Sequence, residues 1–217
     1  MLFSLHKRLT EYRFPPPKSL VVYAGADGTL AHAVVTELIE TLLSDDIVVT
    51  YTSDVRGDPS RPHILVPDDK EGVSQRSRGF LSVCRYIGKL SHTMPTNPTL
   101  ALAIDGRLES LGELEFLSRA HASSGEFGFP MATEDWLATY GIPRALVHLE
   151  TLAALEGGWW MCEVDRESLA DLCWAAALRW CVQTGRVRKD ALVPRHPGLL
   201  QWAQRVGLRE FVTETDE

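Results

Sequence analysis

The apolar positions of the N-terminal part predict strands and helices in alternation. The runs SLVVYA from Ser19, IVVTYT from Ile47 and HILV after Pro62 have the length and the β-branched content of strands. The segment from Thr29 to Leu43 carries an apolar residue at about every fourth position and predicts an amphipathic helix. Its stripe consists of Leu30, Val34, Leu38 and Leu42.

A hairpin and a second helix are expected next. Residues 67–72 contain Pro, Asp and Gly and predict a turn. We expect a short fourth strand from Val73 to Arg76, then a helix to about Leu90 with Ser77 as a candidate N-cap. The order β-α-β, loop, β-β-α is typical of a thioredoxin-like α/β domain.

Beyond Pro98 the pattern is helical only. A long helix is predicted first, followed by a loop near Ser123, by helical runs on both sides of Gly141, and by a helix from about Ser168. The stripe of the long helix consists of Leu100, Ile104, Leu108, Leu111 and Leu114. We therefore expect an extension over 1–18, a thioredoxin-like domain over 19–92 and an all-helical domain over 93–217.

Composition and charge argue against several classes of function. The chain has 217 residues and a formal net charge of -7, and its Lys and Arg residues are dispersed, which argues against a nucleic-acid-binding surface. No apolar run has the length of a membrane span or a signal peptide, so we expect a cytoplasmic protein. The four cysteines form no CxxC pair and the seven histidines no HxxxH pair, so we expect reduced core thiols and no metal site.

The segment MCEVDRESLADL, from Met161 to Leu172, holds the clearest motif. Ser168 and Asp171 have the S-x-x-D spacing of a capping box, in which each side chain bonds the backbone of the other residue. The segment resembles the GDxxSxAD signature of the helical domain of glutathione transferases, with Val164 in place of the glycine. In that family the motif serves folding and packing, so no catalytic role is implied.

The N-terminal half resembles the same family. Arg61-Pro62 before HILV is similar to the family's cis-proline at the start of its third strand. The run from Gly79 to Ile87 resembles the pattern (E/Q)-S-x-A-I-x-x-Y-L, with Tyr86 at the tyrosine. With Leu20 and Leu208 as approximate ends, the resemblance covers nearly the whole chain and implies a glutathione-transferase fold.

The resemblance also implies where glutathione would bind. Tyr23, at the end of the first strand, is similar to the tyrosine that activates the glutathione thiol. Pro62 and the two residues that open the third helix would hold the peptide. Anchoring the register on Tyr86 places Gly79 and Phe80 at that pair, which lacks the expected polar side chains. A second register uses Ser77 preceded by arginine. Thr29 is expected to cap the first helix instead.

Two functions therefore stay open. In the first, the chain is a protein–protein interaction module without cofactor, like the similar domains of elongation factor 1 gamma and of aminoacyl-tRNA synthetases and their scaffold proteins. Its partner would be another protein or a second copy of the chain. In the second, the chain is a divergent glutathione transferase that binds glutathione and uses Tyr23. Helix packing, rather than stacking on nucleic acid, is the expected role of Trp159, Trp160, Trp174, Trp180 and Trp202.

Overall fold

The structure is a computed structural model that describes residues 17–53, 61–67, 75–122, 141–155, 162, 167–187 and 196–208. The strands are β1 (Ser19–Tyr23), β2 (Val48–Tyr51), β3 (His63–Val66) and β4 (Gln75–Arg78). The helices are α2 (Leu30–Leu42), α3 (Phe80–Leu90), α4 (Pro98–Ala122), α6 (Ile142–Leu155), α7 (Leu169–Gln183) and α9 (Pro197–Arg205). The predicted loop near Ser123 and the helical run before Gly141 lie outside the described residues.

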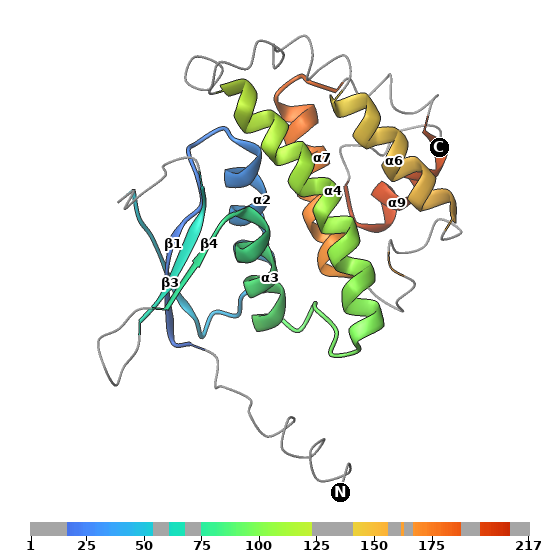
Figure 1. Ribbon diagram of the computed structural model, residues 1–217. Coiled ribbons are helices and arrows are strands. Elements are labelled where there is room, and N and C mark those ends of the chain that lie inside the picture. Colours follow the sequence, from blue (N-terminus) through green and yellow to red (C-terminus); the bar gives the residue numbers. More distant parts are fainter. Residues whose placement is uncertain are drawn as a thin grey trace, which may run out of the picture.

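The four strands form one sheet in the order β2-β1-β3-β4. β1 and β2 are parallel, with Leu20 opposite Val49, and α2 connects them as the predicted β-α-β unit. β3 is antiparallel to both β1 and β4, so that the β3–β4 hairpin completes a thioredoxin-like sheet. Helices α2 and α3 lie on the same side of this sheet, between it and the C-terminal helices (Figure 1).

The buried residues explain why the apolar pattern predicted these elements. Leu20 and Val22 of β1 are fully buried, as are Val34 and Val35 of α2. Thr29 is the N-cap of α2 as expected, because its hydroxyl oxygen accepts the backbone N–H of His32 at 3.2 Å. The long helix α4 buries four of its five predicted stripe residues. These are Ile104, Leu108, Leu111 and Leu114.

Helix α7 lies at the centre of the helical part. Ser168 and Asp171 form the predicted capping box at its start, and solvent barely reaches most of its residues from Leu169 to Cys181. It packs against α4 and against α2 of the N-terminal part. Gly88 lets α3 approach it closely, because a Cβ atom at Gly88 would lie 2.5 Å from the Leu169 side chain. The two parts therefore share one core.

Two sequence expectations about the hairpin need correction. β4 spans Gln75–Arg78 rather than the predicted Val73–Arg76, and α3 begins at Phe80 with Gly79 as its N-cap. Ser77 is therefore not a helix cap, since it lies in β4 opposite Ile64 of β3. Cross-strand pairing with β3 defines this strand, and the sequence QRSR gives no apolar signal for it. Residues 91–97 connect α3 to α4, and a domain boundary there remains our proposal.

Candidate functional site

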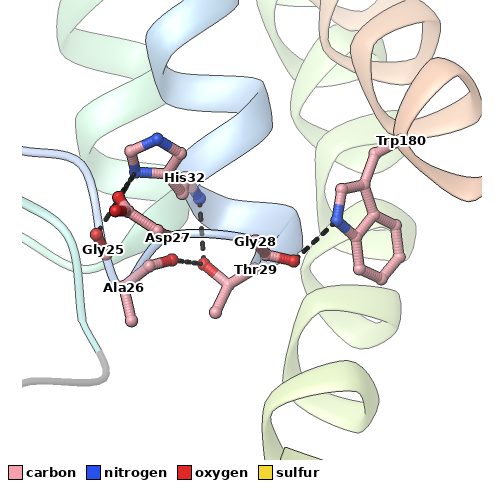
Figure 2. Close-up of polar contacts among 7 residues, drawn as sticks. All are labelled: Gly25, Ala26, Asp27, Gly28, Thr29, His32 and Trp180. Atoms are coloured by element: carbon pink, nitrogen blue, oxygen red, sulfur yellow. Dashed lines mark hydrogen bonds and ion pairs between the residues drawn. The ribbon is translucent and has the colours of Figure 1, made fainter. Parts of the chain in front are cut away.

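The turn between β1 and α2 is closed by its own hydrogen bonds (Figure 2). The hydroxyl of Thr29 donates to the carbonyl oxygen of Ala26 at 2.7 Å while it caps α2. The Nδ1 atom of His32 lies 3.3 Å from the carbonyl oxygen of Gly25 and 3.5 Å from Oδ1 of Asp27. The Thr29 hydroxyl, the natural donor for a ligand here, is thus engaged within the turn.

A tryptophan from the helical part fixes the same turn. The indole N–H of Trp180 on α7 donates to the carbonyl oxygen of Gly28 at 2.9 Å (Figure 2). The guanidinium of Arg186 lies 4.5 Å from the centroid of the Trp180 ring, a cation–π geometry. Arg179, which directly precedes Trp180 on α7, forms an ion pair with Glu37 of α2. Trp180 therefore packs between helices, as expected of the tryptophans, and also holds the turn through a polar bond.

Tyr23, the sequence candidate for thiol activation, lies in the sheet. Its side chain is 7% exposed, and its ring centroid is 5.2 Å from that of His63, with an interplanar angle of 33°. The two residues stand opposite each other in the β1–β3 pair, and His63 is also buried. A ligand thiol would have to reach Tyr23 next to the buried His63 ring. Its catalytic role remains a prediction.

The peptide bond before Pro62 is trans, so the expected cis-proline is wrong. Trans is the lower-energy form of an X–Pro bond by about 0.5–1 kcal/mol, and a cis bond persists where the surrounding structure demands it. With the trans bond, the backbone around Pro62 is hydrogen-bonded within the sheet. The carbonyl oxygen of Pro62 accepts the N–H of Gly79 at 2.9 Å, and His63 is paired with Tyr23 of β1 and Arg78 of β4. The fold does not depend on the isomer, because the strand order is unchanged.

Helix α3 opens with a pair that has no polar side chain. Gly79 is the N-cap with a φ of 99°, a conformation that residues with a Cβ rarely adopt. Phe80 follows as the first helical residue, and its side chain is 6% exposed. This placement agrees with the register anchored on Tyr86. The alternative register fails, because Arg76 and Ser77 belong to β4.

A cleft of about 680 Å³ lies beside this helix opening, between the β3–β4 end of the sheet, α3 and α4. Pro62, Gly79, Phe80, Arg85 and Phe116 are among its lining residues. The guanidinium of Arg85 bonds Asp105 and Glu109 of α4, both at 2.6 Å. A ligand carboxylate would have to compete with these two carboxylates for that cation. The sequence alone did not predict the ion pair between Arg85 and Glu109, because the two residues are 24 positions apart and belong to different helices.

Across the described ranges, no three His, Cys, Asp or Glu side chains gather closely enough to hold a metal ion. All four cysteines are free thiols and buried. None of the helices that the structure describes is both long and apolar enough to cross a membrane.

Comparisons with known proteins give the fold class. No family model and no curated protein matches the sequence. A glutathione S-transferase from Methylobacterium radiotolerans, solved with glutathione sulfonate, aligns with a TM-score of 0.59 at 16% identity, over 92% of this chain and 99% of that one. A glutathione transferase homologue from Sulfitobacter with bound glutathione aligns with a TM-score of 0.58 at 18% identity, over 90% and 95%.

A chain from the yeast aminoacyl-tRNA synthetase complex also aligns, at a TM-score of 0.45 and 12% identity, over 89% of this chain and 88% of that one. That score is too low to support an argument about partners. The bacterial alignments cover both parts of the molecule, and at these identities they show the fold. The protein has the glutathione-transferase fold, a thioredoxin-like unit joined to an all-helical unit.

Proposed function

We propose that this chain is a protein–protein interaction module on the glutathione-transferase fold that binds glutathione weakly or not at all. The opening of α3 carries this proposal. Gly79 has no side chain to accept a hydrogen bond from the ligand's ammonium, and Phe80 has no hydroxyl for its carboxylate. The loss of one charge-assisted hydrogen bond costs about 1.5–3 kcal/mol, or roughly tenfold to a hundredfold in affinity.

The rest of the expected glutathione site supports the same conclusion. The Thr29 hydroxyl already bonds Ala26, and the carbonyl oxygen of Gly28 already accepts from Trp180. Arg85, a cation in the lining of the cleft beside the helix opening, already bonds two carboxylates. A peptide ligand would have to replace these internal bonds rather than add new ones, which reduces the net gain on binding.

The outer face of α4 supports an interaction surface. Leu102 is 72% exposed and Phe116 is 57% exposed, and the two residues are 14 positions apart, two heptads, so they lie on nearly the same side of the helix. Val147 of α6 is also 57% exposed. We propose that a protein partner or a second copy of the chain covers this face. Components of translation or aminoacyl-tRNA synthetase complexes, suggested by the family resemblance, are the first partners to test.

The surface proposal is tested with matched variants. Phe116→Ser, placed in the face, should abolish co-purification of the partner or convert a dimer to a monomer in size-exclusion chromatography with light scattering. Val48→Ser removes a similarly exposed apolar side chain from β2, 63% exposed, and should leave the assembly intact. An assembly that survives Phe116→Ser, Leu102→Ser and Val147→Ser together would overturn the proposed surface.

The alternative is a divergent glutathione transferase. The cleft beside Pro62 and the α3 opening favours it, because a volume of about 680 Å³ suits a small ligand. Two neighbours of the same fold were solved with glutathione or its sulfonate. In this case Tyr23 would activate the thiol and Pro62 would contact the peptide. A thiol-conjugation assay with an electrophilic aryl halide distinguishes the two functions, since the interaction module gives no turnover above the uncatalysed rate.

A further inference from the structure

A second cavity, of about 550 Å³, lies between α4, α6 and α7. It shares Glu113 and Leu117 with the cleft beside α3, but the described residues that line it all belong to the helical part. Neither the proposed interaction face nor the expected glutathione site requires this cavity. Its volume falls within the range of small-molecule sites in proteins, about 300–1,000 Å³.

One part of the lining is apolar. Leu114 is 4% exposed and Trp174 is 2% exposed, so both reach the cavity from the core rather than from the surface. The indole N–H of Trp174 donates to the carbonyl oxygen of Arg107 at 3.1 Å. Because that donor is already bonded, the ring offers the cavity an apolar surface. A hydrocarbon or aromatic group would gain free energy by burial there.

Another part of the lining is polar and cationic. The hydroxyl oxygen of Ser110 on α4 lies 3.1 Å from Nε2 of His148 on α6. Arg144, one helical turn before His148, lines the cavity from the exposed side. Arg144 and Glu113 are the charged residues in the described lining. Arg107 lies outside this lining but adds positive charge near His148.

We propose that this cavity binds a compact apolar monocarboxylic acid, with the carboxylate at Arg144 and the hydrocarbon part against Trp174. When Nε2 of His148 carries the imidazole proton, it donates to the oxygen of Ser110. The hydroxyl hydrogen of Ser110 then points to the ligand carboxylate as a second donor. Glu113 disfavours a second negative charge, which selects monoacids over diacids.

The test is calorimetric titration of the full chain with 1-naphthylacetate, and with the neutral 1-naphthylacetamide as the matched ligand. We expect one site for the acid and at least roughly tenfold weaker binding of the amide, the loss typical of one charge-assisted hydrogen bond. Arg144→Gln should reduce the affinity for the acid roughly tenfold and leave that for the amide unchanged. Arg205→Gln makes the same charge change on α9, away from the cavity lining, and should have no effect.

Two further measurements locate the ligand. Ala145→Trp fills the cavity and should abolish binding of both molecules. Independently of whether that variant folds, the acid should shift the imidazole NMR signal that is missing in His148→Gln. Three results would overturn the proposal: no binding of the acid at millimolar concentration, equal affinity for acid and amide, or acid binding that Arg144→Gln leaves unchanged.

Discussion

The indole N–H of Trp202 on α9 donates a 2.8 Å hydrogen bond to Oδ1 of Asp171, a carboxylate that solvent does not reach. The other oxygen, Oδ2, accepts the backbone N–H of Ser168 at 2.9 Å and its hydroxyl at 2.6 Å. The capping box at the start of α7 thus also anchors the last described helix. One carboxylate at the start of α7 thus bonds a residue of α9 that is 31 positions further along the chain.

Asp171→Ala should therefore cost more than a helix cap, which is worth about 1 kcal/mol. The variant leaves the N–H groups of Ser168 and Trp202 buried without their acceptor, and each hydrogen bond to a charged group contributes about 1.5–3 kcal/mol. We expect the free energy of unfolding in urea to fall by about 3 kcal/mol or more. Asp45→Ala, in an exposed turn, should change it by less than about 0.5 kcal/mol. A loss of about 1 kcal/mol or less for Asp171→Ala would show that Trp202 contributes nothing.

The N-terminus of α9 receives its cap from another helix. The carboxylate of Glu150 on α6 accepts the N–H of Gly198 at 2.9 Å and that of Leu199 at 2.6 Å. Glu150→Ala should lower the free energy of unfolding by about 1–2 kcal/mol, as lost caps do.

Gly198 tests the same contact from the other side. A Cβ atom at Gly198 would lie 3.0 Å from Oε1 of Glu150, so Gly198→Ala should destabilise the wild-type chain although alanine favours helices. In the Glu150→Ala background the same change should be neutral or stabilising. A double-mutant cycle of urea denaturation measures this coupling, and additive effects would contradict the described contact.

The sequence revealed the features that depend on neighbouring residues. The helical stripe of α2 is buried where the periodicity placed it, at Leu30, Val34 and Leu38. The capping box of Ser168 was visible because its two members are three residues apart. Both features can be recognised from the types and spacing of residues within one short segment of the sequence.

What the sequence could not show depends on distant partners. β4 exists because its backbone pairs with β3, and its side chains carry no strand pattern. The bond from Trp180 to the turn spans 152 residues, and the Ser110–His148 pair spans 38. No local periodicity encodes such contacts.

His148 should titrate below the usual range. Burial lowers its pKa, and so do the positive charges of Arg107 and Arg144, while Glu113 opposes them. Its native pKa lies below the unfolded value of about 6.5, so its contribution to stability is complete above that pH and is lost as the pH falls toward the native pKa. NMR titration should give a pKa below 6.5 that rises in Arg144→Gln. A pKa at or above 6.5 would contradict the described surroundings.

Cys173 and Cys181 should be inert in the native state. Burial raises the pKa of Cys173 well above its usual range, with help from a hydrogen bond to Cys84, and burial raises that of Cys181 to about 12. The thiolate is the reactive form, so both stay protonated at pH 8. A chromogenic aromatic disulfide should therefore label neither of them in the native protein and all four cysteines in denaturant. Rapid labelling of Cys173 or Cys181 in the native protein would contradict the burial.

The affinity for glutathione tests the central claim most directly. Calorimetric titration of the full chain with millimolar glutathione, run beside an active glutathione transferase as the positive control, measures it. The opening of α3 at Gly79 and Phe80 predicts no saturable binding in the micromolar range. A micromolar Kd, together with conjugation that disappears in Tyr23→Phe, would contradict the interaction module and establish the enzyme.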